Sequence, residues 1–239
     1  MSNDPTVLIF GGTGAIGRAI ARRFERAQWR VVGTSRTGSD GNAKPVSGEV
    51  VRLDPFDAKP GIESLDRIAP FEAVCWAQGV NINDSAAEFD ESRHLDVYRA
   101  NCLFVLKTLN WLLTRKLLAE RARLCVISSI WQQLARQNKL SYCVSKAALQ
   151  GLVLSAAVDL APRGILVNAV LPGAIDTPMT RRALSAEQIR RLEQASPFGR
   201  LATLEEVAEA VYSLCSRDNK GVSGQFIVVD SGFSYARLV

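Results

Sequence analysis

Runs of apolar and β-branched residues alternate along the chain with longer stretches in which apolar residues recur at helical spacing. Seven such runs lie at residues 6–10, 30–35, 49–53, 72–76, 123–129, 165–170 and 225–230. Several of them are apolar almost throughout, which is typical of strands covered on both faces. The alternation predicts the α/β fold class, with a doubly wound parallel sheet of seven strands.

The chain contains no Pro/Ser-rich linker, no break in composition and no internal repeat. Its 239 residues, 47% hydrophobic and 22% charged, suffice for one large core. We therefore expect a single domain over residues 1–239, in which residues 177–198, after the sixth strand, are a candidate substrate lid. This segment ends in a helix whose start, Ser185 followed by Gln188, fits a capping box. An ordinary connecting helix is the alternative interpretation.

The charge and the apolar runs exclude several classes of partner. Basic residues exceed acidic ones by only 5, 29 against 24, and no long basic run occurs, which argues against nucleic-acid binding. The same balance suits an enzyme that binds a phosphorylated cofactor or an anionic substrate. No uninterrupted apolar run reaches the roughly 18 residues of a membrane span, so we expect a soluble protein without a membrane partner.

Cysteine and histidine usage narrows the chemistry further. Five cysteines stand singly among apolar residues, which predicts buried, reduced thiols and a cytoplasmic location. His94 is the single histidine, so metal sites and catalytic triads that need several imidazoles are excluded, and no metal site is expected. The charged stretch around His94 indicates a surface residue.

A glycine-rich turn joins the first strand to the following helix. It consists of Gly11, Gly12, Thr13, Gly14, Ala15, Ile16 and Gly17. Its glycines satisfy the spacing GxGxxG, let the backbone approach a pyrophosphate closely, and precede a helix N-terminus with free N–H groups and partial positive charge. The turn therefore predicts a dinucleotide-binding site. A purely structural tight turn is the alternative.

The end of the second strand bears on the choice of dinucleotide. An acidic residue there would hold a ribose 2′-hydroxyl, but Ser35 and Arg36 occupy this position. A guanidinium can bind a 2′-phosphate through charge-assisted hydrogen bonds. The sequence therefore favours NADP(H), with NAD(H) as the alternative if Arg36 only points into water.

Tyr142 and Lys146 lie four residues apart in a helical stretch, which places the phenol and the ammonium on one helix face. A nearby positive charge lowers the pKa of a tyrosine, so Tyr142 is a candidate general acid. Ser129, thirteen residues before Tyr142 and at the end of the fifth strand, could donate a hydrogen bond to a substrate carbonyl oxygen. Ser128 is the alternative serine.

In these motifs the chain resembles the short-chain dehydrogenase/reductase family, in particular its shorter branch, which includes the 3-oxoacyl-carrier-protein reductases. The likeness runs nearly from end to end and implies a Rossmann-type domain. It also implies a catalytic tetrad of Ser129, Tyr142, Lys146 and Asn101. In such a tetrad the tyrosine protonates the carbonyl oxygen and the serine polarises it. The lysine holds the nicotinamide ribose and lowers the tyrosine pKa, and the asparagine anchors a proton relay through water.

The resemblance implies further cofactor contacts. They are Asp54, Ala77, Gly79, Pro172, Gly173, Ile175 and Thr177, in addition to the glycine turn and the pair Tyr142 and Lys146. The chain also departs from the family pattern. Phe10 replaces a threonine, and residues 76–79 read Trp-Ala-Gln-Gly in place of Asn-Asn-Ala-Gly, so hydrogen bonds from the two asparagines must come from elsewhere. Trp131 and Met179 are candidate substrate contacts, and the alternative for Trp131 is a place in the core or wall.

The implied function is reversible hydride transfer between NADP(H) and a small carbonyl or secondary alcohol compound. A 3-oxoacyl thioester, bound to a carrier or to coenzyme A, is one candidate substrate, and the family likeness implies a homodimer or homotetramer. Rival interpretations are a regulatory protein that binds NADP(H) without turnover, an NAD-dependent alcohol dehydrogenase of the same family, and a reductase of C=C bonds. Family members of that last kind typically separate Tyr and Lys by six residues, whereas only three intervene here.

Overall fold

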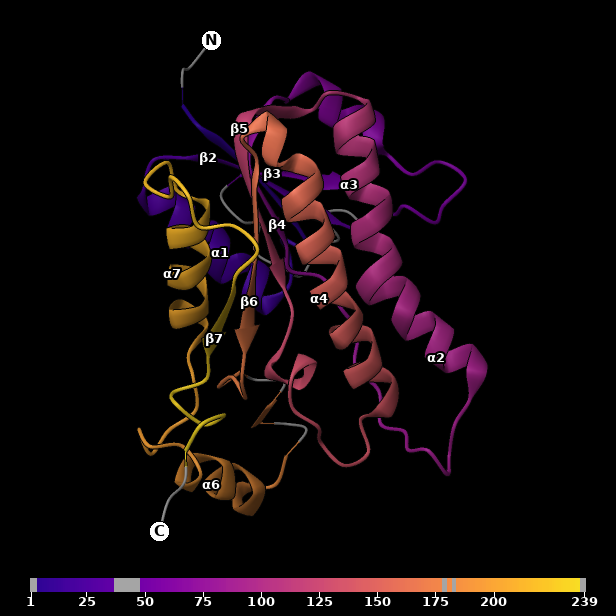
Figure 1. The fold of residues 1–239 in the computed structure, drawn as a ribbon, viewed down its shortest axis with the longest axis vertical. Helices are drawn as coiled ribbons and strands as arrows, with labels where there is room; N and C mark the ends of the chain where they lie inside the picture. The colour runs from indigo at the N-terminus through magenta and orange to yellow at the C-terminus, as the bar shows by residue number, and fades with distance from the viewer. Residues whose placement is uncertain (1–3, 37–47, 178–179, 182–183, 237–239) are drawn as a thin grey trace.

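The computed structural model describes residues 4–36, 48–177, 180–181 and 184–236. In this part of the chain seven parallel strands form one sheet in the order β3-β2-β1-β4-β5-β6-β7 (Figure 1). The strands are β1 (Thr6–Phe10), β2 (Arg30–Ser35), β3 (Glu49–Arg52), β4 (Phe71–Trp76), β5 (Leu118–Ile127), β6 (Leu166–Pro172) and β7 (Phe226–Val229). The predicted doubly wound α/β sheet is confirmed. The winding reverses at β1, and in such sheets ligands bind beyond the carboxyl ends of the strands at this point.

Helices cover both faces of the sheet (Figure 1). They are α1 (Ala15–Arg26), α2 (Glu91–Tyr98), α3 (Phe104–Thr114), α4 (Leu140–Leu160), α6 (Ala186–Gln194) and α7 (Leu204–Cys215). Shorter helical turns are η1 (Ile62–Arg67), η2 (Arg99–Leu103), η3 (Ile130–Gln132) and η4 (Ala161–Arg163). The helices α1 and α7 pack together on one face, and α3 and α4 cover the other.

The alternation of side chains in β1 shows how this sandwich is built. Val7 and Ile9 belong to the apolar core under α1 and α7, whereas Leu8 and Phe10 belong to the core under α3 and α4. Successive strand residues point to opposite faces, so a strand that is apolar at every position fills both cores.

The strand β5 ends earlier than the sequence predicts. It runs to Ile127, and Ser128 still bonds to β6 through its backbone N–H and Val170 O, 2.9 Å apart. Ser129, expected at the strand's end, is instead the extended residue that begins the turn η3. The catalytic serine candidate therefore stands just beyond the carboxyl edge of the sheet.

The long helix α4 is apolar on both sides. Together with η4 it spans Leu140–Arg163 and, by its length and a mean hydropathy of 1.4 alone, could cross a membrane, although the apolar runs of the sequence predict no membrane span. Leu149 and Val153 are buried against the sheet, while Val158 on the outer face is 73% exposed. A helix that packs on a core with one face and is apolar on the other meets the same criteria of length and hydropathy as a membrane span.

The helix α6 lies beyond the carboxyl end of β6 (Figure 1). The predicted capping box is confirmed: Ser185 Oγ accepts from Gln188 N at 3.2 Å, and Gln188 Oε1 accepts from Ser185 N at 2.9 Å. The helix α6, which forms the described second half of the segment 177–198, thus lies at the edge of the sheet where the strands' carboxyl ends meet. Met179 lies outside the described residues.

Candidate active site

The glycine turn is packed so closely that side chains would not fit. A Cβ on Gly17 would lie 2.2 Å from Gly11 O, and one on Gly12 would lie 2.8 Å from Gly33 Cα in β2. Gly14 is exposed and precedes α1 without a side-chain cap. The first N–H groups of α1 thus face an open position at the positive end of the helix, which suits a phosphate.

The glycine turn also adjoins the loop after β4. A Cβ on Gly11 would lie 2.8 Å from Gln78 N, and Gln78 Oε1 is buried with no hydrogen-bond partner among the described residues. On the other side, Arg18 Nε donates to Thr13 O at 2.7 Å. Such a site fits a dinucleotide. Its phosphate oxygens can accept from the backbone N–H groups of the turn, and its hydroxyls can donate to the unpaired amide oxygen.

The residues expected to select the dinucleotide stand next to this cradle. Gly12 N donates to Thr34 O at 3.1 Å, which ties the end of β2 to the glycine turn. Ser35 is half-buried and Arg36 is exposed at this edge. Asp54, after β3, accepts from Phe56 N at 3.0 Å through Oδ1, so one of its oxygens is used in its own turn. The roles of Arg36 and Asp54 toward a cofactor stay predictions.

Lys146 is buried deep in the site, on α4. It is 4% exposed, and its Nζ donates to Ile127 O at 3.0 Å. The same Nζ lies 5.6 Å from the centre of the Tyr142 ring, one helical turn away. Burial lowers the pKa of Lys146 to about 8 because the protonated amine loses its hydration.

The pKa of Tyr142 shifts against expectation. Burial raises it above the ordinary value of a phenol, and a side-chain hydrogen bond with Ser129 only partly offsets this effect. The expected lowering by Lys146 is therefore wrong for the chain as described here. Desolvation of the phenolate outweighs the stabilisation that the Ser129 hydroxyl provides, and no lowering of the Tyr142 pKa comes from Lys146.

Of the two candidate serines, Ser129 is the one whose side chain reaches the phenol. Besides its hydrogen bond with Tyr142, it accepts from Trp131 N at 3.3 Å and lies 3.5 Å from Pro172 O. Ser128 instead directs its hydroxyl to a backbone carbonyl of α4, 3.5 Å away. The geometry favours Ser129 over Ser128 as the partner of a substrate carbonyl.

Asn101 lies in the π-helical turn η2 between α2 and α3 and is 1% exposed. Its Oδ1 accepts from Val80 N at 2.8 Å, and its Nδ2 donates to Val80 O at 3.1 Å and to Ser145 Oγ at 2.9 Å. A Cβ on Gly79 would lie 3.1 Å from Asn101 Oδ1 and 3.7 Å from Lys146 Nζ. Asn101 and Lys146 thus converge on the backbone at Gly79, and π-turns of this kind are frequent at functional sites.

Phe10 and Trp76, which both depart from the family pattern, pack against each other. The rings of Phe10 and Trp76 stack with centroids 5.6 Å apart and planes inclined by 15°. Trp76 Nε1 also donates to Thr108 Oγ1 at 2.8 Å, so the indole is satisfied inside the core. No local sequence pattern predicts this contact, because Phe10 and Trp76 become neighbours only through the pairing of β1 with β4.

The segment after β6 runs along the end of β7. Gly173 N donates to Val229 O at 2.9 Å, and a Cβ on Gly173 would lie 2.5 Å from Asp230 Cβ, so only glycine fits there. Ile175 is buried, and Thr177 Oγ1 accepts from Thr180 N at 3.0 Å. Whether Pro172, Gly173, Ile175 and Thr177 contact a cofactor stays a prediction.

The residues after Ser129 form one wall of the site region. Trp131 is half-buried and packs against the core under α4, in line with its alternative interpretation. Gln132 is 6% exposed, and neither its amide nitrogen nor its amide oxygen has a hydrogen-bond partner among the described residues. Gln132 was not predicted as a site residue, although a buried glutamine three positions after the serine is an unusual choice.

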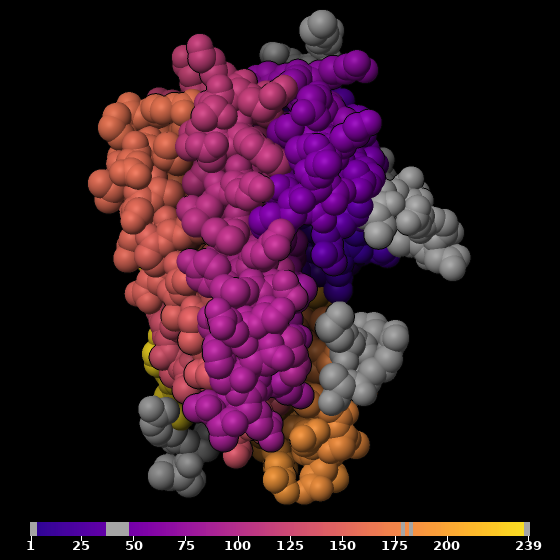
Figure 2. Space-filling model, turned by 90° about the vertical axis from the view of Figure 1, so that its right-hand side faces the viewer, coloured from indigo at the N-terminus to yellow at the C-terminus, as the bar shows by residue number. Residues whose placement is uncertain are grey.

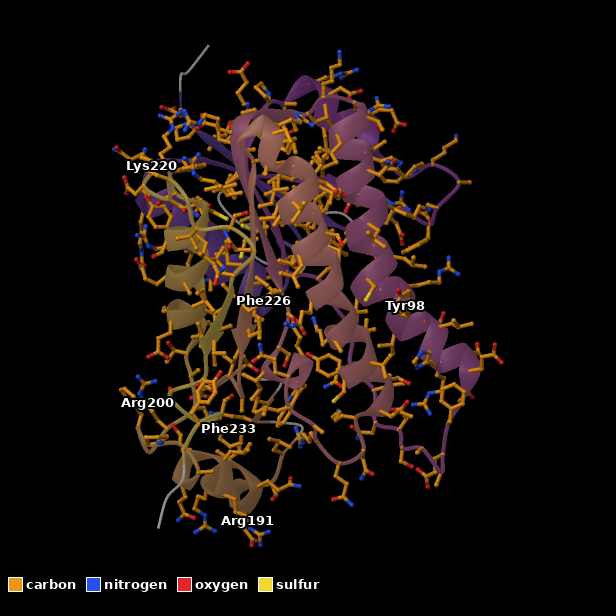
Figure 3. All side chains as sticks on the ribbon, in the orientation of Figure 1. Tyr98, Arg191, Arg200, Lys220, Phe226 and Phe233 are labelled. Carbon is orange, nitrogen blue, oxygen red and sulfur yellow. The ribbon has the colours of Figure 1, made fainter. Side chains whose placement is uncertain are left out.

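Two arginines near α6 are engaged in ion pairs. Arg181 makes two hydrogen bonds to the carboxylate of Asp176, at 2.6 and 2.7 Å. Arg191 pairs with Glu187 on the same helix, and Figure 3 shows it on the outer side of α6, directed away from the sheet. Both arrangements are typical of a solvated surface.

One expectation about a residue outside the tetrad is confirmed only in part. His94, interpreted as a surface residue, is half-buried, and its Nδ1 lies 2.8 Å from Ser141 Oγ in the first turn of α4.

The chain matches known proteins over nearly its whole length. A family model described as enoyl-(acyl carrier protein) reductase matches residues 61–234. The 3-oxoacyl-[acyl-carrier-protein] reductase FabG of Aquifex aeolicus (strain VF5) is 33% identical over 242 residues, which cover 94% of this chain and 95% of that protein. The aldohexose dehydrogenase AldT of Thermoplasma acidophilum, in ligand-free form, has the same fold, with a TM-score of 0.87 at 24% identity over 99% of this chain and 96% of that one. ElxO with NADP bound gives a TM-score of 0.85 at 23% identity over 98% and 100% of the two chains.

The fold, the site and these matches define the protein as an oxidoreductase with a Rossmann-type domain. It belongs to the short-chain dehydrogenase/reductase family, in keeping with an NAD(P)-dependent oxidoreductase that acts on CH–OH or C=O groups.

Proposed function

We propose that the protein interconverts a ketone and a secondary alcohol by hydride transfer with NADP(H), through Ser129, Tyr142, Lys146 and Asn101. The observation that carries this proposal is that the side chains of Lys146 and Asn101 converge on the backbone at Gly79, next to the glycine turn. Lys146 lies one helical turn from the phenol of Tyr142. The four residues come from three elements, since Tyr142 and Lys146 lie on α4, Asn101 in η2 and Ser129 at the start of η3, and they meet where the winding of the sheet reverses. A regulatory protein without turnover would have no use for this arrangement.

Each side chain has a task that follows from its surroundings. The nicotinamide, when bound, supplies the hydride. Tyr142 gives its proton to the carbonyl oxygen, which its raised pKa allows because the phenol stays protonated at neutral pH. Ser129 donates a hydrogen bond to the same oxygen. Lys146 holds the nicotinamide ribose, and Asn101 keeps the backbone at Val80 in place beside the proton path.

The dinucleotide would be held by the glycine turn and the residues around it. Gly14 leaves the first N–H groups of α1 open to the pyrophosphate, and Gln78 Oε1 can accept a hydrogen bond from a ribose hydroxyl of the dinucleotide. Arg36 is exposed at the end of β2, where it can pair with a 2′-phosphate. NADP is also the ligand of ElxO, a protein of the same fold. NADP(H) is therefore proposed over NAD(H).

Replacing Arg36 by Ala tests the cofactor choice. We expect kcat/KM for NADPH to fall about tenfold while that for NADH changes little, because one charge-assisted contact is lost. A preference for NADH that survives this substitution would contradict the proposal. Arg26, an exposed arginine at the end of α1, serves as the control position.

A 3-oxoacyl thioester is the proposed substrate class, since the FabG relative is named for reducing one. Residues 177–198 would close over it as a lid, with Met179 and Trp131 among its contacts. The matching family model is described as an enoyl reductase, but only three residues separate Tyr142 from Lys146, which favours C=O over C=C reduction. NADPH consumption with a panel of ketones and enoyl thioesters, measured for the wild type and Tyr142→Phe, distinguishes the two.

The apolar outer face of α3 and α4 supports a homodimer or homotetramer. Leu106, Val144, Leu154 and Val158 are all at least 44% exposed there. A groove of about 410 Å³ between the two helices continues this face. Exposed apolar patches of this kind mark association surfaces, and a second copy of the chain is the proposed occupant.

The remaining proposals concern the chain as a whole. Residues 1–239 act as one domain, because every described strand belongs to one sheet. The five cysteines are free thiols, and Cys75 Sγ and Cys215 Sγ are 3.9 Å apart, in a hydrogen bond and not a disulfide, which suits a reducing cytoplasm.

A further inference from the structure

The helix that carries Tyr142 is capped by a distant residue. Its N-cap residue, Lys139, makes no capping hydrogen bond with its side chain. Asp84, from the loop after β4, supplies the cap instead: Ser141 N donates to Asp84 Oδ1 at 3.1 Å and to Oδ2 at 3.3 Å. A carboxylate at a helix N-terminus satisfies free N–H groups and is favoured by the helix dipole. Asp84 is 5% exposed, so the helix end and the buried carboxylate satisfy each other.

Ser141 connects this cap to His94. Its Oγ is fully buried, donates to Asp84 Oδ2, and lies 2.8 Å from His94 Nδ1. A carboxylate oxygen only accepts, and a hydroxyl has a single hydrogen. The hydrogen of Ser141 therefore goes to Asp84, and Ser141 Oγ accepts from His94 Nδ1–H. The neutral ring must accordingly carry its hydrogen on Nδ1, and a protonated ring carries it there as well.

The loop that contains Asp84 is fastened along its length. Lys139 Nζ donates to three of its oxygens, Asn81 Oδ1 at 2.9 Å, Ile82 O at 3.2 Å and Asn83 Oδ1 at 2.6 Å. At the other end of the loop, Asn101 holds both backbone groups of Val80. The loop thus ties η2, which carries Asn101, to the first turn of α4, which carries Tyr142.

We propose that Asp84, Ser141 and His94 form a clamp that positions Tyr142 for proton transfer, with His94 Nδ1–H as its closing donor. This inference rests on the proposed function of Tyr142. The phenol directly follows Ser141 in the chain, and His94 comes from α2, which packs against α4 on the outer surface (Figure 2). A misplacement of about 1 Å in a reacting group can cost about a hundredfold in rate. None of the three residues needs to touch the substrate, so all act as positioning residues.

Two variants of His94 test the donor directly. In His94→Asn, Nδ2 can take the place of Nδ1 as donor, whereas His94→Leu has none. With NADPH and the acetoacetyl thioester of N-acetylcysteamine, we expect kcat to fall about tenfold in His94→Leu and about twofold or less in His94→Asn, with KM nearly unchanged. Leu95→Ala, an exposed position on the same helix, is the matched control. Equal kcat values for the Asn and Leu variants would overturn the proposal.

Two spectroscopic measurements do not depend on turnover. His94 is the single histidine of the chain, so its ring nitrogens give an unambiguous ¹⁵N NMR signal. We expect the neutral ring to be protonated at Nδ1, and Ser141→Ala to abolish this preference; a ring protonated at Nε2 would refute the clamp.

The second measurement is the titration of Tyr142, followed through its labelled ring carbon. In His94→Leu the pKa of Tyr142 should move toward the ordinary phenol value, because a loosened helical turn admits water. In His94→Asn the titration of Tyr142 should be the same as in the wild type. This expectation does not depend on which reaction the protein catalyses. A wild type that turns over no ketone but shows these signals would refute the proposed function and leave the clamp intact. Unchanged titration in all variants would refute the clamp alone.

Discussion

The buried amine of Lys146 should make the stability of the protein depend on pH in a way that a single substitution reveals. Its pKa is lowered from 10.5 to about 8 by burial. Between these values the unfolded chain binds more protons than the folded one, so the stability rises with pH in this window. Below pH 8 both states are protonated, and the fold bears the full cost of about 3 kcal/mol, at about 1.4 kcal/mol per unit of pKa shift.

The assay compares urea unfolding of the wild type and Lys146→Met across this window. Met keeps the apolar stem and removes the charge. We expect the free energy of unfolding of Lys146→Met, relative to that of the wild type, to fall by about 2 kcal/mol between pH 7 and about pH 9.5. The lost hydrogen bond to Ile127 O lowers the stability of the variant by the same amount at every pH. Thiols of the unfolded chain also titrate in this range, whereas burial raises the pKa of Cys102 in the folded chain to about 11. This contribution is present in both chains, so most of it cancels in the difference.

Lys59→Met is the matched control, since Lys59 is exposed in the loop after β3. Its difference from the wild type should be flat with pH. If the Lys146→Met difference is equally flat, the amine is hydrated in the folded protein and the desolvation argument for this site fails. A difference that grows with pH would mean that a buried partner holds the ammonium charged.

Phe10→Thr and Trp76→Asn restore the family residues, and a double-mutant cycle of urea unfolding should show a coupling of about 1 kcal/mol from the lost stack; strictly additive effects would contradict it. Val158→Glu places a charge on the apolar outer face of α4 and should convert the proposed oligomer to a monomer in light scattering, whereas an unchanged mass would exclude this face as the interface. Alcohol oxidation should rise steadily from about pH 7 to about pH 10, because only the phenolate of Tyr142 accepts the proton of the alcohol and burial raises its pKa. A profile that is level in this range would assign the proton to another group.

Local patterns in the sequence were enough to predict much of this protein. The strands β1 and β2 stand at the predicted residues, since alternation and apolar runs report burial of short segments directly. The glycine turn and the spacing of Tyr142 and Lys146 are equally local, because a turn and one helical repeat lie within a few residues. The capping box at Ser185 is confirmed for the same reason.

Contacts between distant residues decided the rest. The stacking of Phe10 on Trp76 and the capping of α4 by Asp84, 57 residues before Ser141, depend on which strands and loops become neighbours. The spacing of Tyr142 and Lys146 predicts the wrong direction for the pKa shift of Tyr142. The spacing shows that a charged residue is near in the sequence, but the loss of water around the phenol depends on residues from distant parts of the chain. Periodicity and spacing are properties of neighbouring residues, whereas desolvation and partner choice arise only when the whole chain has packed.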